Sequence, residues 1–299
     1  METLESLHRK INGAGELKSV VRTMKAMSAS NISQYEAAVS SLQDYYKAVS
    51  LGIIACFNQG EKEYVNEKQS SKNNDEKEIC AIVFGSDQGL VGQFNDVLTH
   101  FVSESLNKLQ GKKEIWSVGE RVQFLLSDVG LMSTHFFNVP NSVNAITSLV
   151  SEILIKSEKE FENGTTKEFY IFHNQQQEEG GYKPISQRLL PLDDKWKQNF
   201  EKLHWPTLKK PEVIGPYEKT MQALIHEYLF VSLYKACAES LATENASRLS
   251  AMRRAEKNIE ELLDNLSHKY HNLRQSSIDE ELFDVVGGFE ALKKEMLIN

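Results

Sequence analysis

Both ends of this 299-residue sequence are long proline-free stretches in which apolar residues recur every seven positions. Within residues 1–58, one column of sevens holds Leu7, Ala14, Val21, Ser28, Tyr35, Leu42 and Val49; a second holds Leu4, Ile11, Lys18, Lys25, Ile32, Val39, Tyr46 and Ile53. Two mostly apolar positions in seven are typical of a coiled-coil seam. Asn12-Gly13 is also compatible with a hairpin turn, but the period of 3.5 favours one long helix over residues 1–58.

The C-terminal segment, residues 209–299, repeats the pattern after its last proline, Pro216. One column holds Leu224, Val231, Ala238, Asn245, Met252, Ile259, Leu266 and Leu273; its partner column holds Tyr234, Leu241, Arg248, Ala255, Leu262 and Lys269. At ~1.5 Å per residue this helix would be about 115 Å long and the N-terminal helix about 85 Å. A globular domain does not accommodate such helices, so we expect them to pair as an antiparallel coiled coil.

The central part of the chain differs in character from both ends. Residues 59–77 are polar and predict a flexible linker. In residues 78–208, strand-like runs alternate with helical stretches near 94–110, 119–129 and 142–161. The strand-like runs are Ile79–Phe84, Glu114–Val118, Glu168–Phe172 and Ile185–Leu190. This alternation predicts an inserted α/β domain, Rossmann-like, with at least part of its sheet parallel. The predicted fold class is therefore α/β with a long α-helical coiled coil.

The segment FGSDQGLVGQFN, which follows the first predicted strand, raises the question of a phosphate site. Its glycines are Gly85, Gly89 and Gly92. A P-loop requires GxxxxGK[ST] and a dinucleotide loop GxGxxG, and neither spacing occurs here. The one charge of the loop, Asp87, would repel phosphate. We predict a tight structural turn and no direct nucleotide or cofactor binding.

Other kinds of site are not indicated. A net charge of −8 and a pI near 5.6 argue against nucleic-acid binding. No apolar run approaches the roughly 18 residues of a membrane helix. His226-Glu227 begins an HExxH pattern but lacks its second histidine, and His268 and His271 have no carboxylate or thiol at ligand spacing. We therefore predict no metal site and no catalytic residue.

Two features of the predicted helices suggest contacts with other proteins. Residues 8–25 hold Arg9, Lys10, Lys18, Arg22 and Lys25, and residues 248–257 hold Arg248, Arg253, Arg254 and Lys257. These groups form either an ordinary solvated surface or a charged collar that meets an acidic partner. The C-terminal end carries apolar residues at helical spacing, namely Ile278, Leu282, Phe283, Val285, Val286, Phe289 and Leu292. They pack either on their own chain or, as we favour, inside a partner.

These residues resemble the γ subunit of F-type rotary ATP synthases over nearly the whole chain. SDQGLVGQFN (Ser86–Asn95) is similar to that family's SDRGLCGGFN without a gap. At the N-terminal end Ile11, Met24, Ala29 and Ser30 match more loosely. The C-terminal match falls on Met252, Ala255, Asn258, Tyr270, Arg274, Gln275, Ile278, Glu281, Leu282, Val286, Gly288, Ala291 and Leu292.

The resemblance implies a central rotor shaft that couples rotation of a membrane c-ring to nucleotide-state changes in a ring of α and β subunits. The implied partners are those α and β subunits, an ε subunit and the c-ring. The implied contacts with the α/β ring are Met24, Lys25, Arg274, Gln275, Asp279 and Glu281. The loop with Gly85, Asp87, Gly89, Gly92 and Asn95 would be structural, in the foot of the shaft. The implied subunit is non-catalytic, and lies peripherally on the cytoplasmic face of a bacterial inner membrane.

The sequence also departs from the family pattern. Asn31 stands where a basic residue is usual, Gln88 and Val91 replace the loop's arginine and cysteine, and His271 replaces an asparagine. These differences suggest a divergent branch, for which a bacterial type that works mainly as an ATP-driven ion pump is a candidate. The alternatives to a shaft are a non-rotary coiled-coil scaffold or an enzyme built on the central domain, and residues 78–208 offer no catalytic cluster for the latter.

Overall fold

The computed structural model describes residues 3–59, 78–162, 167–177, 181–191, 209, 214 and 216–296. The side chains of residues 57–59, 158–162, 167 and 289–296 are outside this description. The linker expected over residues 59–77 therefore lies almost wholly outside the described residues. So do the side chains of Phe289 and Leu292.

Two long helices account for the two ends of the chain. Helix α1 spans Leu4–Gln59 and helix α7 spans Tyr217–Met296. Asn12-Gly13 lies within α1, so the alternative of a hairpin turn at this pair is wrong. The predicted columns of sevens supply the buried residues: Leu7, Val21 and Tyr35 are at most 5% exposed. The long helices predicted from the heptads are thus confirmed.

The chain divides into two compact units, and each contains part of both helices. One, the coiled-coil unit, comprises Met1–Met27 and Leu249–Asn299. The other, the α/β unit, comprises Ser28–Arg248. The four-segment division proposed from the sequence remains a prediction.

A five-stranded sheet forms the centre of the α/β unit, with strand order β3-β2-β1-β4-β5. Its strands are β1 (Glu78–Phe84), β2 (Lys112–Val118), β3 (Ser133–Phe137), β4 (Lys167–Gln176) and β5 (Tyr182–Leu190). Strands β3, β2, β1 and β4 are mutually parallel, and β5 pairs antiparallel with β4. This order reverses between β1 and β4, as in doubly wound folds, and confirms the predicted Rossmann-like α/β architecture.

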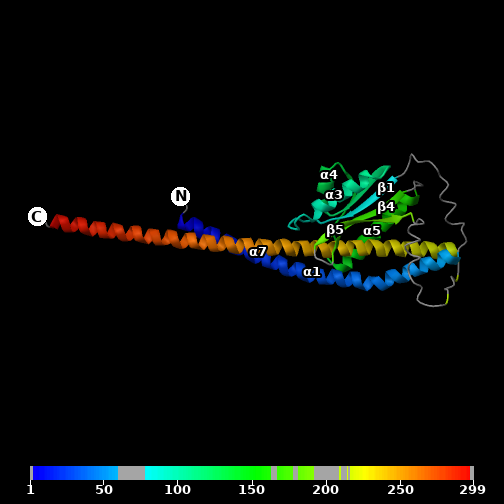
Figure 1. The fold of residues 1–299 in the computed structure, drawn as a ribbon, viewed down its shortest axis with the longest axis horizontal. Helices are drawn as coiled ribbons and strands as arrows, with labels where there is room; N and C mark the ends of the chain where they lie inside the picture. Colours follow the sequence, from blue (N-terminus) through cyan, green and yellow to red (C-terminus); the bar gives the residue numbers. More distant parts are fainter. Residues whose placement is uncertain are drawn as a thin grey trace. The chain divides into compact units, whose positions relative to one another are not determined.

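Helices cover both faces of this sheet (Figure 1). Helices α3 (Phe94–Asn107) and α4 (Glu120–Asp128) pack on one face through residues such as Leu98 and Val122. Helix α5 (Val143–Glu162) and the included part of α7 pack on the other face, with Ile153 and Leu241 in one core with Trp116. Because both faces are covered, β1 is almost entirely apolar and buried.

Strand β3 is the one strand of the described sheet that the sequence did not predict. It reads STHFF, is only five residues long, and pairs with β2 alone. Its residues alternate between half-buried and exposed until Phe137, so it lacks the apolar run that marked β1. The other predicted strands and the three predicted helices of this unit are confirmed, with shifts of a few residues at their ends.

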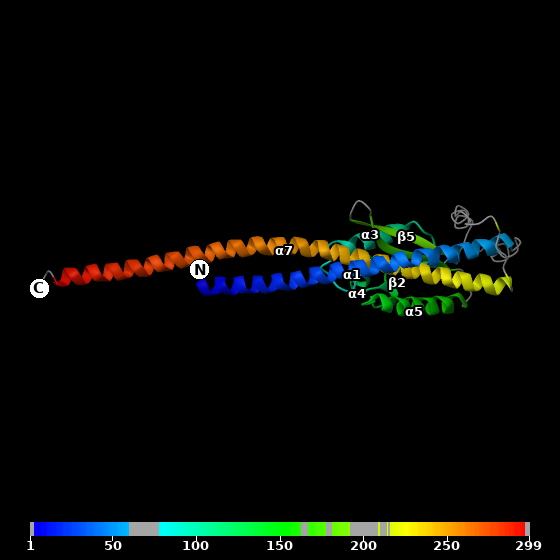
Figure 2. The same ribbon diagram turned by 90° about the horizontal axis from the view of Figure 1, so that it is seen from below.

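Within each unit α1 and α7 run antiparallel. In the α/β unit, Tyr46 packs against Tyr228 and the Tyr45 hydroxyl donates to Glu227 at 2.6 Å. Figure 2 shows the two helices side by side in this unit. In the coiled-coil unit, Ala14, Val21, Met252 and Ile259 form a small buried cluster. The predicted antiparallel coiled coil is thereby confirmed.

Candidate functional site

The glycine loop, residues 85–93 after β1, is shaped by close backbone approaches. A Cβ added to Gly85 would lie 2.3 Å from Cβ of Val122, so this position requires glycine for space. Gly92 has a φ of 62°, in the left-handed region. Leu90 adopts the same φ of 62° without being glycine. Gly89 needs neither space nor positive φ, because a Cβ added there would have nothing within 4 Å and its φ is not positive.

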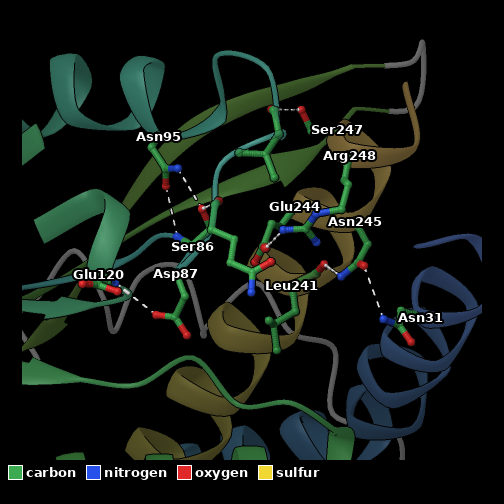
Figure 3. Close-up of polar contacts among 12 residues, drawn as sticks. Asn31, Ser86, Asp87, Asn95, Glu120, Leu241, Glu244, Asn245, Ser247 and Arg248 are labelled. Carbon is green, nitrogen blue, oxygen red and sulfur yellow. Dashed lines mark hydrogen bonds and ion pairs between the residues drawn. The ribbon is translucent and has the colours of Figure 1, made fainter. Parts of the chain in front are cut away.

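Ser86 and Asn95 fasten the two ends of this loop together. The Ser86 backbone N–H donates to Asn95 Oδ1 at 3.0 Å, and Asn95 Nδ2 donates to Ser86 Oγ at 2.8 Å (Figure 3). The Ser86 hydroxyl donates in turn to the carbonyl oxygen of Gln88 at 2.8 Å. Both side chains are buried, so these bonds are made away from water, where leaving them unmade would be costly.

Asp87 lies at the N-terminus of α4. Its Oδ1 accepts a hydrogen bond from the backbone N–H of Glu120 at 3.0 Å. A carboxylate is stabilised at this end of a helix by the unpaired N–H groups and the helix dipole. An open depression beside it is lined by Asp87, Gln88, Glu120, Gln123, Phe136 and Asn138. Two of these lining residues are carboxylates and none is a cation, which makes the depression a poor place for phosphate.

The edge of the sheet where β1 and β4 end is closed by the protein's own groups. Asn174 on β4 donates to the carbonyl oxygen of Phe94 at 2.9 Å, and Ser240 on α7 donates to the carbonyl oxygen of Phe84 at 3.0 Å. Ser247, further along α7, donates to the carbonyl oxygen of Val91 in the glycine loop. Doubly wound folds bind nucleotides where the strand order reverses, which in this sheet is between β1 and β4. In this chain the hydrogen bonds at that edge hold the glycine loop against α7, which favours a structural role for the loop.

A buried carboxylate lies on α7 beneath the glycine loop. Glu244 is 5% exposed and accepts a hydrogen bond from Arg248 at 2.6 Å. Burial raises the pKa of Glu244, the Arg248 charge opposes that rise, and the Asp87 charge adds to it. Asn245, next to Glu244 in the sequence, accepts a hydrogen bond from Asn31 at 3.4 Å. This bond links α7 to α1 through Asn31, the position at which the family pattern has a basic residue.

A network of ion pairs joins α1 to α7 in the coiled-coil unit. Lys18 pairs with Glu260 at 2.9 Å, and Arg22 pairs with Glu256 at 2.8 Å and with Glu260 at 3.8 Å. Lys25 pairs with Glu256 as well. The hydrogen bonds from Lys25 and then Arg22 lower the pKa of Glu256 to about 2. The basic residues of 18–25 thus meet carboxylates of their own chain. The sequence alone suggested only a solvated surface or an acidic partner protein for them.

The residues expected to contact an α/β ring fall into two groups. Met24 packs beside the buried cluster of the coiled-coil unit and Lys25 is ion-paired, so both face α7. The second group lies along α7 beyond Leu266, the last buried residue among those of this helix whose side chains are described, and all four of its members are exposed. These four are Arg274, Gln275, Asp279 and Glu281.

The apolar residues at the end of α7 are exposed in the described structure. Phe283 is 77% exposed and Val285 72%. Ile278, Leu282 and Val286 are between 46% and 58% exposed. None of these five side chains belongs to a buried cluster of the described residues. Packing on their own chain, one of the two alternatives from the sequence, is therefore not seen for them.

Membrane-spanning helices and metal clusters are not found in the part of the chain that the structure describes. None of the helices there combines the length and apolar character needed to cross a membrane. No group of three or more His, Cys, Asp or Glu residues within the described ranges is arranged to hold a metal ion. Cys56, Cys80 and Cys237 are buried, and no disulfide links them in the described ranges.

Comparison with known proteins identifies the family. The model of the ATP-synt family, described as ATP synthase, matches residues 3–292. The chain belongs to the ATP synthase family. It is similar to the ATP synthase gamma chain of Nautilia profundicola, with 24% identity over 98% of this chain and the full length of that protein. The gamma chain of Elusimicrobium minutum is 26% identical with the same coverage.

Solved structures of family members share the fold. A chain of the Euglena gracilis mitochondrial ATP synthase rotor superposes with a TM-score of 0.61 at 15% identity, covering 92% of this chain and 98% of that one. A chain of the Tetrahymena thermophila mitochondrial ATP synthase central stalk and c-ring gives a TM-score of 0.55 at 20% identity. The superposition covers 79% of this chain and 99% of that one. These matches agree with the resemblance seen in the sequence and do not favour an unrelated coiled-coil scaffold.

Proposed function

We propose that this chain is the γ subunit of an F-type ATP synthase or ATPase and works as its central rotor shaft. The observation that carries the proposal is the family match over residues 3–292, joined to an antiparallel helix pair whose longer member carries exposed apolar residues at 278–286. The similar proteins are named ATP synthase gamma chain, and the similar structures come from rotors and central stalks.

The unpaired end of α7 is the part that we assign to the α/β ring. Pairing with α1 reaches His8, whose ring lies 6.2 Å from that of Tyr270. Residues 274–296 continue α7 beyond this contact for about 34 Å. Phe283 and its apolar neighbours face water there, at a cost in free energy that apolar contacts with a surrounding ring would remove. Arg274, Gln275, Asp279 and Glu281 flank them and supply polar contacts with the same ring.

Met24 and Lys25 are assigned to the moving part of a β subunit. Met24 is partly buried and Lys25 keeps about a third of its side chain exposed while paired with Glu256. Each can therefore offer one side to a partner. In this mechanism, the shaft presents different faces to three β subunits and stabilises a different conformation of each. Rotation exchanges these conformations, and so couples nucleotide chemistry to ion flow.

The α/β unit is assigned to the foot of the shaft, beside an ε subunit and the c-ring. The glycine loop with Gly85, Asp87, Gly89, Gly92 and Asn95 has a structural role here, because its polar groups bind the chain's own backbone. The subunit itself is non-catalytic and binds no nucleotide. It lies peripherally on the cytoplasmic face of a bacterial membrane, and the translocated ion is H⁺ or Na⁺ according to the c-ring.

Reconstitution tests the proposal. The cognate α and β subunits are purified and their Mg-ATPase activity is measured with and without this chain. We expect a large rise in turnover and a complex with one copy of the chain for every three β subunits. Unchanged turnover together with no complex would refute the shaft assignment and leave a coiled coil with other partners.

A further inference from the structure

The apolar seam of the coiled-coil unit holds α1 to α7 only weakly. Its central buried cluster consists of Ala14, Val21, Met252 and Ile259, two of the partly buried residues beside them are alanines, and Leu7 and Leu266 extend the seam. Alanine buries little apolar area, so this cluster contributes less than the larger cores of the α/β unit. Met24 and Leu263 add only partial burial.

The same seam is also ambiguous in register. Leu7, Ala14 and Val21 recur at intervals of seven on α1, as do Met252, Ile259 and Leu266 on α7. A shift of one helix by seven residues would again bring apolar residues together. A shift in one direction would bring Leu273 into the seam and a shift in the other direction Asn245, so apolar packing selects only weakly among these alignments.

The ion pairs distinguish the alignments that the seam does not. In the observed register, the cations of α1 meet Glu256 and Glu260. A shift of seven residues in one direction would place Leu249 and Arg253 at these positions. A shift in the other direction would place Leu263 and Ser267 there. Neither alternative places a carboxylate at these two positions, so the network around Glu256 and Glu260 is lost in both.

Glu256 is the centre of this network. Both of its oxygens accept hydrogen bonds from α1, Oε1 from Arg22 and Oε2 from Lys25. Its side chain is only 14% exposed, whereas isolated surface pairs on the same helix are open to water: Lys257 and Glu261 are 79% and 63% exposed. Exposed single pairs contribute little, but networks that satisfy one shielded carboxylate twice contribute more.

We propose that Lys18, Arg22, Lys25, Glu256 and Glu260 form an ionic clamp that holds the N-terminal part of α1 on α7 in a single register. The apolar seam stabilises the pairing of the two helices, and the clamp selects their register. Single polar residues in the core of a coiled coil fix its register in the same way. Lys18 and Lys25, which interrupt the apolar column, are then alignment residues rather than defects. The proposal concerns the chain by itself, so it stands or fails independently of the rotary function.

Hydrogen–deuterium exchange of the full-length chain tests the clamp. In the double variant Glu256→Gln/Glu260→Gln, we expect the amides of residues 4–27 to exchange about 10-fold faster or more, because this part of α1 opens from α7 more often. Amides of β1 and β4 report whether the rest of the chain remains folded. The matched control is Glu261→Gln, which removes a carboxylate of the same helix that pairs with Lys257 of that helix. Its exchange should equal that of the wild type.

Two further experiments test the clamp: a reversal of the charges of the Lys18–Glu260 pair, and hydrogen–deuterium exchange at high salt. Lys18→Glu and Glu260→Lys should each accelerate exchange in residues 4–27, and the two together should restore slower exchange, because an ion pair re-forms with reversed sign. Wild-type exchange in about 1 M salt should approach that of the Gln double variant, since screening weakens the pairs. Wild-type protection in the Gln double variant, or a swapped variant that exchanges faster than either single one, would overturn the proposal.

Discussion

Asp87 Oδ1 accepts a hydrogen bond from the backbone N–H of Glu120 at 3.0 Å, so the one charge of the glycine loop caps the helix that follows β2. Carboxylates repel phosphate but stabilise helix N-termini. The same carboxylate that argues against phosphate in the sequence thus has a structural partner in the fold.

Asp87→Asn should destabilise the α/β unit by about 0.5–1 kcal/mol, because a neutral amide interacts less favourably with the N-terminus of α4. Asp128→Asn is the matched control, since Asp128 ends the same helix, where a negative charge is unfavourable. It should leave stability unchanged or raise it slightly. Urea unfolding of both variants measures the difference, and equal effects of the two substitutions would contradict the capping role.

Gly85→Ala should be strongly destabilising, by about 1–3 kcal/mol, because its Cβ would lie 2.3 Å from Cβ of Val122. Gly89→Ala is the control in the same loop, with nothing within 4 Å of the added atom, and should be nearly neutral. Thermal unfolding of the two variants makes the comparison. Val122→Gly, which removes the clashing Cβ, should recover part of the loss when combined with Gly85→Ala, whereas strict additivity would show that the clash is elsewhere.

Glu256 makes the coiled-coil unit sensitive to acid. Its pKa falls from 4.5 to about 2 on folding, since Lys25 and Arg22 donate to the carboxylate. A depressed folded pKa gives stability that is present above pH ~4.5 and lost as the pH falls towards about 2. Glu256→Gln should therefore be less stable than the wild type near neutral pH, and the difference should shrink over this window. Circular dichroism melts at a series of pH values measure it; a constant difference would contradict the ion pairing.

Phe283→Ala distinguishes a partner-facing tip from a self-packed one. Phe283 is 77% exposed, so the substitution should change the stability of the free chain by no more than about 0.5 kcal/mol. Binding to the α and β subunits should weaken by about 2 kcal/mol if Phe283 is an anchor of the interface. Unfolding of the free chain and a titration into the α and β subunits give the two values. Loss of stability with unaltered assembly would place the side chain against its own chain.

Arg274→Ala/Gln275→Ala should lower ATP-driven ion pumping relative to ATP hydrolysis, or impair assembly, because both side chains are exposed on the part of α7 assigned to the ring. Asp128→Asn, at the end of α4, serves as the control for an unrelated change of surface charge. Pumping in membrane vesicles and hydrolysis are measured on the same preparations. Wild-type values of both in the double variant would remove these residues from the proposed contact.

The heptad periodicity predicted the long helices well because most of their buried residues recur at this spacing. The heptad column of α7 is buried from Val231 to Leu266, and only its ends, Leu224 and Leu273, are partly exposed. Strand β1 could be predicted because both of its faces are covered, and its residues are correspondingly apolar. Strand β3 was missed because an edge strand with a half-exposed face has no such run.

The polar contacts were harder to predict because they join residues far apart in sequence. Ser240 and Ser247 reach carbonyl oxygens 156 positions away, and nothing in a helical serine marks its partner. The ion pairs between the helices could have been predicted from the sequence. Lys18 and Lys25 occupy two successive positions of one apolar column, where partly buried cations need carboxylates opposite them. The exposure of the C-terminal apolar residues, by contrast, followed from their spacing and from the shorter partner helix.

The most direct test of the shaft assignment is to observe rotation. The cognate α and β subunits are assembled with this chain and fixed to a surface, and a bead attached to the α/β unit is followed after ATP is added. The rotor account predicts continuous rotation in one direction, with one preferred stopping position for each β subunit. A fully assembled complex that hydrolyses ATP while the bead only fluctuates about a fixed angle would contradict it.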